Sequence, residues 1–290
     1  MQTRKPIVAG QFYPAEKGQC IDEIDECLQK GMGVQNLPDT IAGGIVPHAG
    51  WVFSGPAAAS VFSAVKKRHD SVDTFIIFGA AHSYSGPAPA VYEAGTWQMP
   101  LGEIDIDEEL AKKVLDSQTA ISDFKAHAYE HSIEVQVPFV QRLFPEAKLL
   151  AIVVPPVKQS ILLGQAIGDI INREDKKIVC IGSTDLTHYG PRFAFTPMGI
   201  GAEAVKWATE VNDKKFIDSA LKLDAEQLLA DSVQSQNACG PGAAAATIAA
   251  VEKLGKTKGI LLQHTNSVEV MQAGMGAADD NSVGYAAIVF

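Results

Sequence analysis

Short apolar runs alternate along the chain with longer stretches in which apolar residues recur at helical spacing. The apolar runs are rich in Ile, Val and Phe and are continuous, which is typical of strands that helices cover on both faces. They span residues 44–46, 74–78, 149–154, 177–181, 259–262 and 285–290. The helical stretches span residues 21–29, 56–67, 107–115, 133–143, 161–171, 202–212, 225–229 and 243–254. This alternation predicts a single-domain α/β sandwich over residues 1–290, with a central mixed, largely parallel sheet flanked by helices.

Charge and composition exclude several classes of protein. The 24 Lys and Arg residues against 34 Asp and Glu residues give a net charge of −10, so we expect neither nucleic acid nor an anionic membrane surface as a partner. No apolar run approaches the roughly 18–20 residues of a membrane span. Arg4 and Lys5 are followed by no apolar segment of the kind that signal peptides contain. The expected location is therefore the cytoplasm, where the four cysteines, which form no CxxC pair, would stay reduced.

The histidines follow the predicted strands. His48 comes after the run 44–46, His82 comes after 74–78, and Asp185 and His188 come after 177–181. Ligands of open α/β sheets bind outside the carboxyl ends of the strands, so parallel strands would bring these side chains to one rim. A single histidine after a strand is more often part of a turn, but the repetition, with small Gly and Ala neighbours, favours a site.

Two further segments contain candidate chemistry, each with an alternative. Glu134 lies one turn after His131 on the same predicted helical face, which suits either an acid/base pair or the acidic first turn of a helix. Cys239 precedes an Ala-rich helix, where a thiolate is stabilised as a nucleophile or a soft metal ligand. The alternative is a small, inert, buried cysteine. His127 and His264 could also reach the rim, whereas His69 is expected on the surface.

Two histidines, one cysteine and nearby carboxylates would suit a transition metal. Imidazole fits iron, copper and zinc, and a thiolate shifts the preference toward softer ions. Three protein ligands leave open coordination positions, which is the pattern of a reactive site. Asp185, His188, His131 and Glu134 would then orient the ligands or act as acid/base groups.

Seven motifs occur in order along the chain: VAGQFYP at 8–14, PHAGW at 47–51, GAAH at 79–82, EHSIEVQVPF at 130–139, STDLTHYG at 183–190, CG at 239–240 and SVGYAA at 282–287. Together they resemble the Memo family, whose microbial members are called AmmeMemoRadiSam system protein B. The resemblance implies a fold similar to the catalytic subunit of class III extradiol ring-cleaving dioxygenases, which are non-haem iron enzymes. It also implies a metal bound by His48, His82 and Cys239, with Asp185 and His188 beside it.

Two departures accompany the resemblance. The dioxygenases use a carboxylate as third ligand where this chain would use a thiolate, and family members often have Ser-His-His where this chain has Ala81-His82-Ser83. The system name implies an AMMECR-type protein and a radical SAM protein as partners.

Three hypotheses follow for the function. The first is a metal-dependent oxidoreductase or dioxygenase-like protein acting on a small molecule, with Fe(II) favoured over Cu or Zn. In it, the metal ligands are His48, His82 and Cys239, and the acid/base or pocket-lining residues are His188, Asp185, His131 and Glu134. The second is a non-enzymatic metal carrier or peptide-binding redox scaffold, with a cleft near Trp51, Phe53 and Tyr189. The third is a hydrolase in which His188 and Asp185 activate Cys239 as nucleophile.

Overall fold

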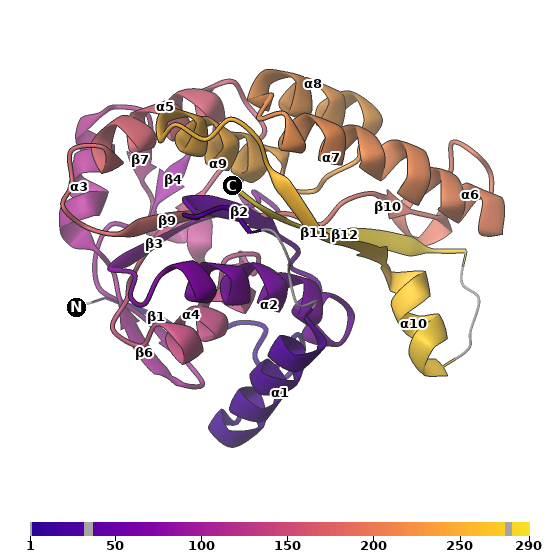
Figure 1. Ribbon diagram of the computed structural model, residues 1–290, viewed down its shortest axis with the longest axis horizontal. Helices are drawn as coiled ribbons and strands as arrows, with labels where there is room; N and C mark the ends of the chain where they lie inside the picture. Colours follow the sequence, from indigo (N-terminus) through magenta and orange to yellow (C-terminus); the bar gives the residue numbers. More distant parts are fainter. Residues whose placement is uncertain (1, 32–36, 276–279) are drawn as a thin grey trace.

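A nine-stranded mixed sheet forms the centre of the protein. The structure, a computed structural model, describes residues 2–31, 37–275 and 280–290 (Figure 1). The strands in spatial order are β10 (His188–Tyr189), β12 (Ser282–Val289), β2 (Gly43–Val46), β9 (Ile178–Ser183), β3 (Thr74–Gly79), β8 (Lys148–Val153), β4 (Ala90–Val91) and β7 (Ile121–Ser122), and β11 (Ile260–Asn266) pairs with β12. A separate three-stranded sheet consists of β1 (Thr3–Arg4), β5 (Thr96–Met99) and β6 (Gly102–Asp105).

The middle of the large sheet is parallel and wholly buried. Strands β2, β9, β3 and β8 run parallel to one another, and β12 and β4 flank them in antiparallel orientation. Every residue of β2, β3 and β9 is buried, which accounts for their continuous apolar sequence. The carboxyl ends of these three strands, at Val46, Gly79 and Ser183, therefore meet at one edge of the sheet.

Helices cover both faces of this sheet, as Figure 1 shows. One layer contains α1 (Lys17–Lys30), α2 (Trp51–Arg68) and α4 (Val137–Leu143), and the other contains α3 (Glu108–Asp116), α5 (Gln159–Ile171), α7 (Lys214–Leu221), α8 (Ala225–Ser235) and α9 (Pro241–Lys253). The Ala-rich α9 packs closely against α5, where a Cβ on Gly164 would collide with the Ala246 carbonyl oxygen. The predicted α/β sandwich with a mixed, largely parallel sheet is confirmed.

Two elements extend from this body near strands β10 and β12: α6 (Ala202–Trp207) and α10 (Ser267–Met275) (Figure 1). A π-helical turn, Ala208–Asp213, joins α6 to α7, so the helix predicted over 202–212 is only partly regular. The helix predicted over 133–143 also divides, into a 3₁₀ turn at Glu134–Gln136 and α4. Among the described residues, no helix is both long enough and apolar enough to cross a membrane.

Candidate metal centre

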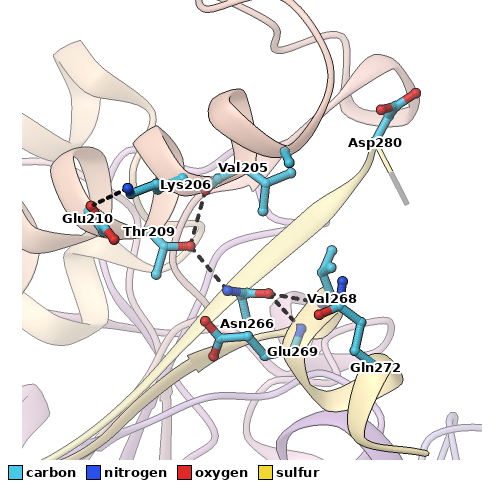
Figure 2. Close-up of a pocket in the computed structure, with 10 residues that line it drawn as sticks. Val205, Lys206, Thr209, Glu210, Asn266, Val268, Glu269, Gln272 and Asp280 are labelled. Atoms are coloured by element: carbon cyan, nitrogen blue, oxygen red, sulfur yellow. Dashed lines mark hydrogen bonds and ion pairs between the residues drawn. The ribbon is translucent and has the colours of Figure 1, made fainter. Parts of the chain in front are cut away.

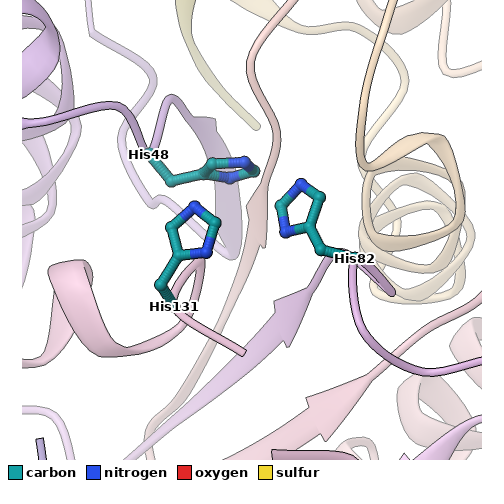
Figure 3. Close-up of side chains that lie close together, drawn as sticks. All are labelled: His48, His82 and His131. Atoms are coloured by element: carbon teal, nitrogen blue, oxygen red, sulfur yellow. The ribbon is translucent and has the colours of Figure 1, made fainter. Parts of the chain in front are cut away.

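Three histidines meet at the carboxyl edge of the parallel strands (Figure 3). One ring nitrogen from each of His48, His82 and His131 lies within 4.8 Å of the others. The His82 and His131 rings stack with centroids 4.8 Å apart, and His48 stands edge-on to both, at 5.1 Å and 5.4 Å. Imidazole nitrogens at this spacing can share one metal ion.

His48 is fixed through both of its ring nitrogens. Its Nδ1 lies 3.1 Å from the Ser183 hydroxyl at the end of β9, and its Nε2 lies 3.1 Å from Cys239 Sγ. Burial and, secondarily, the neighbouring histidines lower the pKa of His48 well below its ordinary value. The ring is therefore neutral, which is the form that binds a metal.

Glu130 holds His82 in place. One carboxylate oxygen lies 3.1 Å from His82 Nδ1, and the other accepts the His82 backbone N–H at 3.0 Å. Burial alone would raise the pKa of Glu130, but His82 and the Ser132 N–H outweigh it and hold that pKa at about 2. A buried carboxylate on the far nitrogen of a histidine fixes the ring orientation and makes the other nitrogen a stronger ligand.

The surroundings of His82 also favour a cation. Burial lowers the pKa of His82, but the hydrogen bonds to Cys239 and Glu130 have the larger combined effect and raise it above its ordinary value. A metal ion bound to His82 would therefore displace a proton from it, because histidine binds metals in its neutral form. The donor set of imidazoles and a thiol, with its buried partners, therefore fits a transition metal.

Cys239 and Asp185 are tied to each other just ahead of α9. The Asp185 N–H donates to Cys239 Sγ at 3.3 Å, and the Cys239 N–H donates to the Asp185 carbonyl at 3.2 Å. The Asp185 carboxylate accepts the backbone N–H groups of His48 at 2.6 Å and Ala49 at 3.3 Å. Asp185 thus joins the loop of Cys239 to the loop of His48.

The cluster opens into a cavity of about 530 Å³. His188 lines it, with Nδ1 3.1 Å from the Leu186 carbonyl and its ring edge-on to Phe193. The cavity is lined by His48, His82, His131, Asp185 and His188 together with Gln11, Phe12, Phe53, Arg192, Phe193, Met271 and Tyr285, among others. It thus combines a polar floor with apolar walls, as small-molecule sites commonly do.

Glu134 does not lie where its helical spacing predicts. Its carboxylate is fully buried and accepts the backbone N–H groups of Ile7 and Val8, the Tyr13 hydroxyl and the Arg4 guanidinium. It does not line the cavity, because the backbone at 134 forms a 3₁₀ turn and the N-terminal segment donates hydrogen bonds to the carboxylate. The pocket-lining expectation is therefore corrected: Glu134 anchors the N-terminus.

Two predicted aromatic neighbours are also absent from the cavity wall. Trp51 is buried and donates its indole N–H to the Val135 carbonyl. The Tyr189 hydroxyl donates to the Gly199 carbonyl, and only Phe53 of the predicted trio lines the cavity. Phe12 lies there as well, with its ring 5.0 Å from that of His131. Its place in the N-terminal motif was the only sequence signal for it.

The remaining histidines lie outside the cluster. His127 is buried, with Nε2 3.1 Å from the Ala90 carbonyl. His264 pairs with Asp213 at 3.2 Å. His69 contacts the Ile41 carbonyl at the end of α2. The other three cysteines, Cys20, Cys27 and Cys180, are buried.

The sequence comparisons now identify the family. A model described as Memo-like protein matches residues 4–289. The chain belongs to the Memo family. A MEMO1 family protein of Thermococcus onnurineus is 36% identical over 296 residues, which is 99% of each chain. Memo relatives from Methanosarcina acetivorans and Pyrobaculum arsenaticum are 36% and 33% identical, over 100% of this chain and 99% of theirs.

Proposed function

We propose that this Memo protein binds one transition metal ion through His48, His82 and Cys239, beside a cavity that receives a small organic molecule. The observation that supports this most is the convergence of donors. The nitrogens of three histidines lie within 4.8 Å of one another, and the thiol lies 3.1 Å from one of them. His131 is close enough to serve as an additional or exchanging ligand.

We favour Fe(II) because of the resemblance to the non-haem iron dioxygenases. Cu and Zn are alternatives, because imidazole suits all three ions and a thiolate suits the softer ones. When bound, the metal would supply Lewis-acid or redox chemistry to a molecule in the cavity. His188 lines the cavity and is placed to exchange a proton with that molecule. Phe12, Phe53 and Phe193 provide apolar contacts for an aromatic or aliphatic portion.

Two other functions remain as alternatives. A peptide-binding scaffold would use the same phenylalanine walls without turnover. A cysteine nucleophile activated by His188 and Asp185 has less support, because it leaves His82 without a role and because the imidazole 3.1 Å from Cys239 Sγ is that of His48.

The test is metal uptake by protein purified without oxygen and reconstituted separately with Fe(II), Cu(I) and Zn(II). We expect one ion per wild-type chain and a loss of uptake in His48→Ala, His82→Ala and Cys239→Ser. His69→Ala is the matched control, since α2 has eighteen residues and His69 therefore lies about 27 Å along the helix from its start beside the site. Equal uptake by His48→Ala and wild type would contradict the ligand assignment.

A second measurement separates an enzyme from a binding module. Oxygen consumption by the iron-loaded protein with catechol-type compounds would support turnover. Metal binding with no oxygen consumption, together with peptide binding that Phe53→Ala abolishes, would support the scaffold.

A further inference from the structure

The π-helical turn at Ala208–Asp213 contacts the segment that supplies Asp185 and His188 to the candidate site. Such turns are rare and frequently occur at functional sites. The wider turn leaves a smaller rotation between consecutive residues than an α-helix does. Its last two residues, Asn212 and Asp213, are consequently both buried and both bonded to Thr187.

Thr187 is bonded on two sides by these neighbours. The Asp213 carboxylate accepts the Thr187 backbone N–H at 2.9 Å, and the Asn212 amide donates to the Thr187 hydroxyl at 3.1 Å. We call Asn212 and Asp213 the Thr187 clamp. Because Thr187 stands between Asp185 and His188 in the chain, the clamp fixes the segment that supplies both of these cavity residues.

The same clamp reaches the loop of Cys239. The Asn212 side-chain amide also donates to the Ser235 backbone carbonyl at 3.0 Å, and the backbone carbonyl of Asn212 accepts the Asn237 side-chain amide at 3.0 Å. Asn237 is two residues before Cys239. One asparagine therefore sets the spacing between the loop that supplies the thiol and the loop that supplies His188.

Strand β12 closes the arrangement from the opposite side. The Leu186 N–H donates to the Gly284 carbonyl at 2.7 Å, and the Gly284 N–H donates to the Thr187 carbonyl at 3.1 Å. A Cβ at Gly284 would collide with the Asp213 carboxylate, so the strand and the clamp are in direct contact. His264 on β11 lies 3.2 Å from the same carboxylate.

The chemistry of the clamp argues against a packing role. Within the described part of the chain, the buried side-chain carbonyl oxygens of Asn212 and Asn237 have no hydrogen-bond partner. Unsatisfied buried polar atoms are destabilising, and apolar residues of similar size would avoid that cost. The presence of asparagine at 212 and 237 is explained if the side-chain N–H groups are needed to hold the loop of Thr187 and the loop of Cys239.

We propose that Asn212 and Asp213 are positioning residues that set the geometry of the metal centre, by fixing Thr187 and the loop of Cys239 relative to the histidines. This proposal rests on the proposed metal-binding function. Residues that orient metal ligands from outside typically change metal affinity by about 10–100-fold when they are mutated.

The test is titration of the metal-free protein with Co(II) under argon. The thiolate-to-cobalt charge-transfer band reports the bond to Cys239, and the ligand-field bands report the coordination number. We expect Asn212→Ala and Asp213→Ala to weaken Co(II) binding at least about tenfold and to diminish the charge-transfer band. Asp213→Asn keeps an oxygen that can accept the Thr187 N–H, so this variant should retain the wild-type spectrum.

Asn266→Ala is the matched control. Asn266 is also a buried asparagine, and it donates to Thr209 of the same π turn at 3.1 Å. Figure 2 shows this contact in a separate pocket, which Asn266 lines together with Lys206 and Glu269. Asn266→Ala should lower the stability of the protein without changing the cobalt spectrum. If the alanine variants of the clamp do not fold, Thr187→Val, which removes only the hydroxyl that Asn212 contacts, should still diminish the charge-transfer band.

Wild-type spectra and affinities in all clamp variants would overturn the proposal. If the wild-type protein binds no cobalt, the proposed metal function fails, and the clamp is then judged by the alkylation rate of Cys239 in metal-free protein. Faster alkylation in Asn212→Ala than in Asn266→Ala and wild type supports the clamp, and equal rates refute it.

Discussion

Arg4 offers a direct test of how the site is anchored. It is only 7% exposed, and its guanidinium lies 2.7 Å from the Glu134 carboxylate. It also donates to the backbone carbonyls of His127 at 2.9 Å and Glu130 at 2.6 Å, and it stacks 4.1 Å from the centre of the Trp97 ring. Arg4 therefore holds both ends of the segment that leads to His131.

The structure gives the expected size of the effect of Arg4→Met. Removing one member of a buried ion pair costs about 3–5 kcal/mol, because the other charge stays buried. Glu134 keeps three donors, from Ile7, Val8 and Tyr13, which favours the low end of that range. The two carbonyls that lose a donor add at least about 1 kcal/mol each. We expect a loss of about 5 kcal/mol or more, which is roughly 10 °C in Tm at about 2 °C per kcal/mol for a chain of this size.

Urea unfolding followed by circular dichroism measures this loss. Arg142→Met is the matched control, because Arg142 makes a two-point contact with Asp25 at 3.0 Å but both side chains are about 40% exposed. Pairs of that kind contribute about 1 kcal/mol or less. The double variant Arg4→Met/Glu134→Gln should recover part of the loss, since it removes the unpaired charge. A loss in Arg4→Met no larger than that in Arg142→Met would refute the reasoning.

Three further predictions concern single groups. Glu130→Gln should weaken metal binding by about 10–100-fold in a calorimetric titration, because an amide donor would face His82 Nδ1 in place of a carboxylate. For Asp107, burial raises the pKa, but hydrogen bonds from Thr74 and the Leu110 N–H, with the Lys176 ammonium, lower it below its ordinary value. Its stabilising contribution is therefore complete above its unfolded pKa of about 3.9 and is lost as the pH falls through the lower folded value, so urea midpoints measured from pH 5 to 3 should decline less in Asp107→Asn. Cys239 is only partly buried, whereas Cys20, Cys27 and Cys180 are buried and burial raises their pKa to about 12, so at pH 8 mass spectrometry should find iodoacetamide on Cys239 first.

The sheet and the convergence of the site could be predicted because both depend on local sequence. Continuous apolar runs marked β2, β3 and β9, and parallel strands place their carboxyl ends at one edge. His48, His82 and His188 each follow a strand that ends there. Predicting that these histidines lie together therefore required only that the strands run parallel, which the alternation of strands and helices indicates.

The partners of these residues could not be predicted, because they are distant in sequence. Glu134 has the helical spacing of a pocket residue, yet Arg4, 130 positions away, and the chain around Ile7 determine where its carboxylate lies. The same holds for Glu130 with His82, and for Asn212 with Thr187. Local periodicity reports which face of an element is apolar, but it does not report which distant polar group a buried carboxylate or amide will meet.

Buried contacts between residues distant in sequence explain how loops can form a rigid site. The proposed ligands lie on three different loops, and each is held by a buried group from elsewhere: Ser183 beside His48, Glu130 beside His82, and Asp185 beside Cys239. A metal site needs its donors within about 0.5 Å of the productive geometry, which free loops do not provide. The buried partners supply that restraint before any metal arrives. Substitution of a partner should therefore reduce metal affinity even though every ligand is retained.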